Sequence, residues 1–220
     1  MLVLAVDTTS ASGSVAVGDA GRVQGELRLT SPTAHSARLL PAVEFLLASL
    51  ALAPRDLEGY AVVVGPGSFT GLRVGLSTVQ GLALASGRPC LGVSALDLLA
   101  ARMRGAAPHL AAMIDASRGE VFAGLYDARA RPLAQAQRIE PEAFLARVPP
   151  GAAFLGDWVR PHESELRAAH PGAVLPERSL FLAGTLVRLA AERLAAGEGA
   201  GPETLRPLYL READIRASGR

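Results

Sequence analysis

Apolar residues recur along this chain in short runs, and two separate stretches arrange those runs in the same order. In each stretch an apolar run ends at an aspartate, Asp7 or Asp115, and a turn of small polar residues leads to two further runs. Short apolar runs bounded by turn residues are typical of strands. The predicted strands are 2–6, 14–18 and 22–29 in the first stretch and 110–114, 121–126 and 133–139 in the second. The pattern therefore predicts two three-stranded meanders.

Longer apolar stretches between and after the meanders have the length of helices. With a further strand at 60–64, the predicted helices cover 35–52, 72–86, 141–147, 162–169 and 179–196. The repeated order indicates an α/β fold of two ribonuclease-H-like lobes, the architecture of the actin, Hsp70 and sugar-kinase (ASKHA) superfamily. We expect residues 1–104, completed by the C-terminal segment 180–220, to form the first lobe and residues 105–179 to form a smaller second lobe.

The stretch Gly65–Gly75 joins a predicted strand to a predicted helix. Because unpaired N–H groups at the start of a helix attract anions, a phosphate loop is one interpretation. The spacing fails both common fingerprints, since Thr70 stands where a dinucleotide loop has its third glycine and the chain has no lysine for a Walker loop. The other interpretation is a structural turn, with Pro66 and Gly67 setting the backbone and Thr70 capping the helix. The local pattern leaves both open.

Composition narrows the class of protein. Half of the residues are hydrophobic, enough for a real core, and the net charge of +1 gives no global attraction to nucleic acid or to a membrane. The single cysteine, Cys90, excludes an internal disulfide and is typical of a reducing compartment. No basic leader precedes a long apolar stretch at the amino terminus. We therefore expect a cytoplasmic protein.

Five short motifs, spread in order over the chain, resemble those of one protein family. They are Leu4–Ser10, His35-Ser36 with Leu39–Pro41, Gly65–Gly75, Ser117–Phe122 and Pro207–Arg211. Phe122 departs from the tyrosine that is usual in the family. On these motifs the chain is similar to the TsaB family (formerly YeaZ), bacterial subunits needed to make threonylcarbamoyladenosine in tRNA. The resemblance implies the same two-lobed actin-like fold.

The resemblance also bears on catalysis and on metal binding. TsaB proteins resemble a larger, peptidase-M22-like paralogue, TsaD, which performs the transfer and holds a metal through two histidines. Aligned with TsaD, this chain has Ala95 and Leu99 at the histidine positions, and neither side chain can bind a cation. The resemblance thus implies a chain with no metal site and no catalytic residues. It implies TsaD and the small ATPase TsaE as partners, and a homodimer when the chain is alone.

A nucleotide site is the second expectation from the superfamily, in which the first aspartate turn contacts ATP phosphates and a metal ion. The candidate nucleotide-binding residues are Asp7, Thr8, Thr9, Ser10, Gly67 and Asp115. A structural alternative is a turn whose side chains satisfy the neighbouring backbone groups. We expect no cofactor to be required by this chain alone, with ATP or ADP assigned to the interface of the complex.

The helices predicted over 35–52 and 72–86 carry few charges on any face. A surface helix normally has one apolar stripe and a charged opposite face, so a second apolar stripe indicates a partner. The predicted interface residues are Leu39, Val43, Leu46, Leu50, Leu72, Leu76, Val79 and Ala83. The alternative is that both helices are sandwiched between the two lobes.

Three functions compete on these observations. The first is a non-catalytic scaffold that activates TsaD for threonylcarbamoyl transfer to the adenosine next to the anticodon. The second is an autonomous actin-fold ATPase or an M22-type metalloprotease, which the missing lysine and the missing metal ligands disfavour. The third is direct tRNA binding, which the near-zero net charge disfavours. The sequence favours the scaffold.

Overall fold

The computed structural model describes residues 1–30 and 37–210, and it divides the chain into two units. Unit 1 comprises Met1–Leu98 and Ser179–Leu208, and unit 2 comprises Leu99–Arg178 with Tyr209 and Leu210. The predicted lobe boundary was residue 104, whereas the two units divide between Leu98 and Leu99, inside helix α3 (Ala95–Arg102). The segment that returns to unit 1 begins at Ser179 and ends at Leu208.

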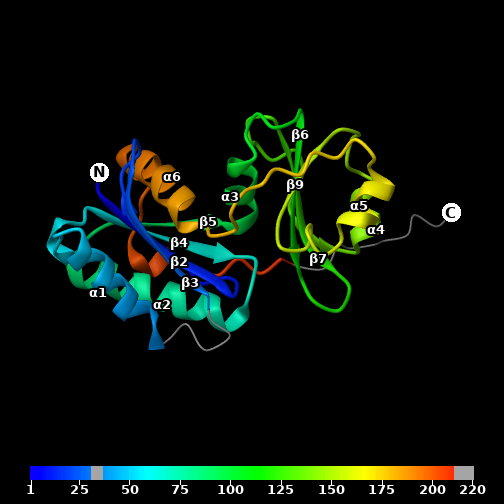
Figure 1. The fold of residues 1–220 in the computed structure, drawn as a ribbon. Helices are drawn as coiled ribbons and strands as arrows, with labels where there is room; N and C mark the ends of the chain where they lie inside the picture. Colours follow the sequence, from blue (N-terminus) through cyan, green and yellow to red (C-terminus); the bar gives the residue numbers. More distant parts are fainter. Residues whose placement is uncertain (31–36, 211–220) are drawn as a thin grey trace. The chain divides into compact units, whose positions relative to one another are not determined.

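Unit 1 is built on a five-stranded sheet with the order β3-β2-β1-β4-β5. The first three strands form an antiparallel meander, and β4 and β5 extend the sheet parallel to β1 (Figure 1). The strands are β1 Val3–Asp7, β2 Ser12–Gly18, β3 Val23–Thr30, β4 Gly59–Gly65 and β5 Cys90–Ser94. Every residue of β1 is buried, as expected for a central strand covered on both faces.

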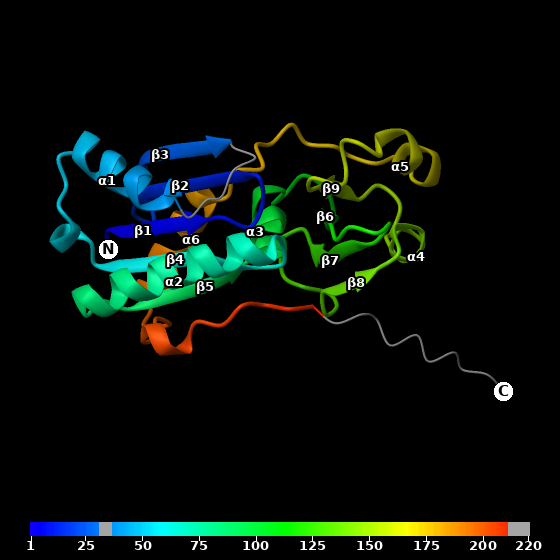
Figure 2. The same ribbon diagram turned by 90° about the horizontal axis from the view of Figure 1, so that it is seen from below.

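Three helices cover this sheet. Helices α1 (Leu39–Ser49) and α2 (Phe69–Ser86) lie on one face and α6 (Ala183–Ala195) on the other (Figure 1). Figure 2 shows α2 lying along β4 and β5, and α2 contacts both strands. The core between the sheet and the first two helices is made of aliphatic side chains, so hydrophobic burial holds α1 and α2 in place.

The start of α6 is capped by the sheet rather than by its own preceding residues. The N–H of Ala183 donates to Ser14 Oγ of β2 at 3.1 Å, and the N–H of Gly184 donates to Glu26 Oε1 of β3 at 3.2 Å. Leu182, at the N-cap, supplies no side-chain hydrogen bond. A helix start leaves several N–H groups without a partner inside the helix, and here two of them are bound by side chains of β2 and β3. These hydrogen bonds anchor the returning segment to unit 1.

Unit 2 repeats the plan of unit 1 with a smaller sheet of order β8-β7-β6-β9. Its first three strands are antiparallel and the fourth is parallel to the first, as in β1 to β4. The strands are β6 His109–Asp115, β7 Val121–Asp127, β8 Gln137–Ile139 and β9 Ala153–Leu155, and the helices are α4 Pro141–Leu145 and α5 Glu163–Ala169. The repeated topology confirms the two ribonuclease-H-like lobes.

One predicted strand is shorter in the structure. The third strand of unit 2 was predicted over 133–139, but β8 begins only at Gln137, and Leu133 is about half exposed. Two 3₁₀ turns, Pro54–Asp56 and Pro202–Thr204, complete the described elements. None of the described helices is both long enough and apolar enough to cross a bilayer.

Candidate functional site

The candidate site in unit 1 lies where β1 and β4 end side by side. These strands are parallel and in register from Val3 opposite Gly59 to Val6 opposite Val62. Parallel neighbours carry their following loops to the same edge of a sheet. The turn Asp7–Ser10 and the loop Gly65–Gly75 therefore meet, as the sequence hypothesis of a shared site requires.

The two segments are joined by direct hydrogen bonds. The Thr8 hydroxyl donates to the carbonyl of Gly71 at 2.7 Å, and the N–H of Ser68 donates to the carbonyl of Thr9 at 2.7 Å. Within the turn, Asp7 Oδ1 accepts the backbone N–H of Thr9 at 3.0 Å and its hydroxyl at 2.7 Å. Asp7, Thr8 and Thr9 are all buried. The turn thus uses its polar groups to hold the glycine loop.

Close packing against this turn explains three of the loop's glycines. A Cβ atom at Gly67 would overlap the carbonyl oxygen of Thr9, one at Gly71 the carbonyl oxygen of Thr8, and one at Gly75 the Thr8 hydroxyl. Backbone oxygens cannot rotate away from such an overlap, so only glycine allows α2 to sit this close to β1. The arrangement supports the structural-turn interpretation of the loop.

The cap of α2 differs from the predicted one. Thr70 was expected to cap the helix, but it lies inside α2, which begins at Phe69. Ser68 is the N-cap, and its Oγ accepts the N–H of Gly71 at 3.3 Å. The prediction was wrong by two residues because Ser68 and Thr70 are both good N-cap residues, and packing against Thr8 selects the first.

The candidate nucleotide residues fall into two places. Ser10 shares the turn with Asp7, and its Oγ accepts the N–H of Ser12 at 3.1 Å. Asp115 ends β6 in unit 2, where its Oδ1 accepts the N–H of Ser117 at 2.8 Å and its own N–H donates to Asp157 Oδ1 at 2.9 Å. The two aspartates therefore hold equivalent positions in the repeated units. Nucleotide binding at either place stays a prediction.

The two residues aligned with the metal-binding histidines of TsaD are apolar, and both are buried in the structure. Ala95 and Leu99 lie in α3 and are buried. Within residues 1–30 and 37–210, no three His, Cys, Asp or Glu side chains gather closely enough to hold a metal ion. This part of the chain therefore offers no ready ligand set.

The predicted interface side chains require a correction. Seven of the eight are buried in unit 1, and six of those line the core against its own sheet. Leu50, the eighth, packs partly against that core. The buried ones are Leu39, Val43, Leu46, Leu72, Leu76, Val79 and Ala83. These side chains are not available to a partner, so any interface on these helices must use their outer faces.

The outer faces carry large apolar side chains that the sequence reasoning did not single out. Leu40 and Phe45 on α1 are 48% and 63% exposed, and Phe69 and Leu84 on α2 are 53% and 74% exposed. The guanidinium of Arg73 lies 4.0 Å from the ring centre of Phe69. The sequence showed a second apolar stripe on these helices. It could not show which of the two stripes packs on the sheet and which is exposed.

Comparison with known proteins identifies relatives over nearly the whole chain. The model of the TsaD family, described as tRNA N6-adenosine threonylcarbamoyltransferase, matches residues 30–153. The tRNA threonylcarbamoyladenosine biosynthesis protein TsaB of Escherichia coli K12 is 31% identical, and the alignment covers 96% of this chain and 95% of that protein. More than half of the chain thus matches the family model, and almost all of it matches the relative.

Solved structures agree at the level of the fold. A crystal structure from Pseudomonas aeruginosa, of an uncharacterized protein with similarity to the peptidase YeaZ, has a TM-score of 0.81 at 33% identity and covers 96% of this chain and 99% of that one. The activator of 2-hydroxyisocaproyl-CoA dehydratase from Clostridium difficile has a TM-score of 0.57 at 8% identity, covering 95% and 100%. This second likeness concerns the fold alone, and it agrees with the predicted two-lobed α/β architecture.

Proposed function

The chain belongs to the TsaB family of tRNA threonylcarbamoyladenosine biosynthesis proteins, and we propose that it serves this pathway as a non-catalytic subunit. Its role in the pathway follows from its family. The proposal adds that it acts in the cytoplasm by pairing with a TsaD-type transferase, with the ATPase TsaE as a further partner. When alone, it pairs with a second copy of itself.

The packing of the glycine loop on Thr8 and Thr9 is the observation that carries the non-catalytic role. A loop that binds phosphate leaves its N–H groups open to the ligand. Here the loop packs closely against the turn of Thr8 and Thr9. The N–H of Ser68 already donates to the carbonyl of Thr9, and the N–H of Gly71 already donates to Ser68 Oγ. This contact of the loop with its own turn supports a structural rather than a phosphate-binding role.

The outer faces of α1 and α2 are the proposed contact for both partners. Their large exposed side chains, among them Phe45 and Leu84, are too apolar for a surface that faces only water. A symmetric contact between two copies would use the same face twice. The homodimer and the complex with the TsaD-type partner are therefore mutually exclusive.

A charge on the outer face of α2 tests this assignment. Leu84 is 74% exposed, so Leu84→Arg leaves the fold intact, but burial of the unpaired charge in an interface costs roughly 3 kcal/mol or more. We expect at least about hundredfold weaker binding to the TsaD-type partner. Leu133→Arg, at a 52% exposed leucine of unit 2, is the matched control.

The measurement combines light scattering of the isolated chain with titration of the partner. The proposal predicts that wild type and Leu133→Arg are dimers that bind the partner, and that Leu84→Arg is a folded monomer that does not. A folded Leu84→Arg protein with normal partner affinity would remove the outer face of α2 from the contact. A wild-type monomer at high concentration would remove the homodimer.

For nucleotide, we propose that the isolated chain binds neither ATP nor ADP and that any nucleotide sits in the assembled complex. The hydroxyl of Thr8 already donates to Gly71, and the N–H and the hydroxyl of Thr9 already donate to Asp7, so these donors of the turn are not free for a phosphate. Calorimetric titration of the chain with ATP and Mg²⁺ should give no binding heat. A stoichiometric signal that Asp7→Ala abolishes would overturn this part of the proposal.

A further inference from the structure

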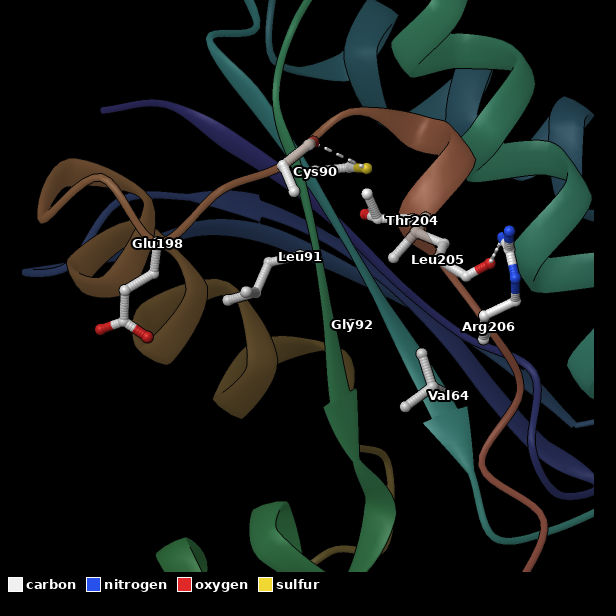
Figure 3. Close-up of a pocket in the computed structure, with 9 residues that line it drawn as sticks. Val64, Cys90, Leu91, Gly92, Glu198, Thr204, Leu205 and Arg206 are labelled. Atoms are coloured by element: carbon white, nitrogen blue, oxygen red, sulfur yellow. Dashed lines mark hydrogen bonds between the residues drawn. The ribbon is translucent and has the colours of Figure 1, made fainter.

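The cavity beside β5 in unit 1 has charged side chains that the protein itself already binds. The cavity has a volume of about 320 Å³, and Figure 3 shows Glu198 and Arg206 on opposite sides of β5. Glu198 pairs with Arg193 at 2.7 Å, and the Arg206 guanidinium donates to the carbonyl of Leu205 at 2.9 Å. A cluster of exposed cations lies instead at one end of the sheet of unit 2.

This cluster, the basic end of unit 2, consists of Arg104, Arg129 and Arg131, which are all exposed. Arg104 precedes β6 and the other two follow β7, and these segments meet because His109 of β6 is opposite Asp127 of β7. Arg104 Nε donates to the carbonyl of Arg129 at 3.2 Å. Among the residues that the structure describes, none of the three guanidinium groups has an ion-pair partner.

One carboxylate, that of Asp127, lies among these arginines. Its Oδ1 accepts the N–H of Arg129 at 2.9 Å and the N–H of Arg131 at 2.8 Å. The N–H of Arg131, together with the nearby charges of Arg131 and Arg129, lowers the pKa of Asp127, so this carboxyl is ionised and both cations lie close to it. Asp127 therefore offsets one of the three positive charges and shapes the turn that carries two of them.

Other acidic residues of this sheet lie at its opposite end. Asp115 is the last residue of β6, and its N–H donates to Asp157, which follows the parallel strand β9. Because β6 runs from His109 to Asp115, roughly 20 Å of extended strand separates the two ends. That separation exceeds the Debye length of about 8 Å at physiological salt, so these acids do not cancel the field of the basic end.

We propose that the basic end of unit 2 binds the phosphate backbone of an RNA chain through the guanidinium groups of Arg104, Arg129 and Arg131. An exposed guanidinium presents paired donors that match phosphate oxygens. The exposed neighbours Gly105 and Ala106 are small, so phosphates can approach the guanidinium groups closely. The choice of RNA among phosphate chains rests on the proposed function. The near-zero net charge of the whole chain does not oppose this contact, because the local charge attracts the phosphates.

Fluorescence anisotropy of a labelled RNA hairpin, titrated with the full chain at several salt concentrations, tests the proposal. Three phosphate contacts predict a slope of about −3 for the logarithm of the binding constant against the logarithm of salt concentration. Arg129→Gln/Arg131→Gln should change this slope to about −1 and weaken binding about tenfold at low salt. The control, Arg55→Gln/Arg188→Gln, removes the same net charge from exposed positions of unit 1 and should leave the slope unchanged.

Asp127→Asn gives a change of opposite sign. It removes the nearby negative charge and keeps an oxygen that accepts the two N–H groups, so it should tighten RNA binding about threefold. RNA binding that is absent at low salt, or that the control weakens as much, would overturn the proposal. Equal competition by polyglutamate of the same charge would assign the surface to an acidic polypeptide and would also overturn it.

Pairing with the TsaD-type partner is measured separately on the same variants. Both double variants leave α1 and α2 unchanged, so both should bind that partner as wild type does. Loss of the RNA contact with normal pairing would therefore leave the proposed function standing, and loss of pairing at Leu84→Arg would leave the RNA contact intact.

Discussion

Replacing Gly71 by alanine measures how tightly the glycine loop is packed on the first turn. The new Cβ atom would overlap the carbonyl oxygen of Thr8. Overpacking costs about 1–3 kcal/mol, and we expect the upper end because a backbone oxygen cannot move aside. Gly81 lies in the same helix with nothing within 4 Å of its added Cβ atom. Gly81→Ala should therefore stabilise the protein by about 0.5–1 kcal/mol through helix propensity.

The two variants make the same chemical change in one helix, so their difference isolates the overlap. We expect Gly81→Ala to exceed Gly71→Ala in unfolding free energy by roughly 3 kcal/mol, the upper end of the overpacking cost. Urea unfolding followed by far-ultraviolet circular dichroism gives both values. The single tryptophan, Trp158, lies in unit 2, so its fluorescence does not report directly on α2.

Equal stability of the two alanine variants would refute the reasoning. The loop would then have room at Gly71, and its close contact with the carbonyl oxygen of Thr8 would not exist. A Gly71→Ala protein that keeps its stability but gains or loses affinity for ATP would favour the phosphate-loop interpretation outright.

Three further predictions concern the stability of the folded protein. Ser14→Ala removes the cap of the Ala183 N–H and should lower the unfolding free energy by about 1 kcal/mol in urea titrations. Val79→Arg places a charge at a fully buried position, so expression should yield unstable or insoluble protein, and a stable Val79→Arg would contradict the core assignment. The N–H of Arg131 lowers the pKa of Asp127, so this carboxylate stabilises the fold above the ordinary aspartate range and loses that effect as pH falls through its folded pKa. Asp127→Asn should flatten acid unfolding, and an unchanged acid profile would contradict it.

The repeat of the fold was predictable because each meander opens with a strand buried on at least one face. The apolar runs that end at Asp7 and Asp115 correspond to β1 and β6, and both aspartates close their strands as expected. The unpredicted helix α3 shows the limit of that method. Leu96, Leu98 and most of its other residues are buried, so no polar face marks it as a helix.

The candidate site was less predictable than the fold. The candidate nucleotide residues included both the aspartate turn and Gly67, but it is the structure that brings the two segments together, because β1 and β4 are parallel neighbours. The sequence does not reveal that Gly71 and Gly75 must be glycines to pack against Thr8, because segments far apart in the chain make this contact only after folding. On α2, apolar side chains on both faces hid which one, Val79 or Leu84, points outward.

Reconstitution of threonylcarbamoyl transfer to tRNA tests the central claim most directly. The TsaD-type partner and TsaE would be assayed with and without this chain, and the chain would also be assayed by itself. The account predicts transfer only when the partner and this chain are both present, with Leu84→Arg inactive and Leu133→Arg active. Turnover by the chain alone above about 1 s⁻¹, the lower end of ordinary enzymes, or full transfer without the chain, would contradict the account.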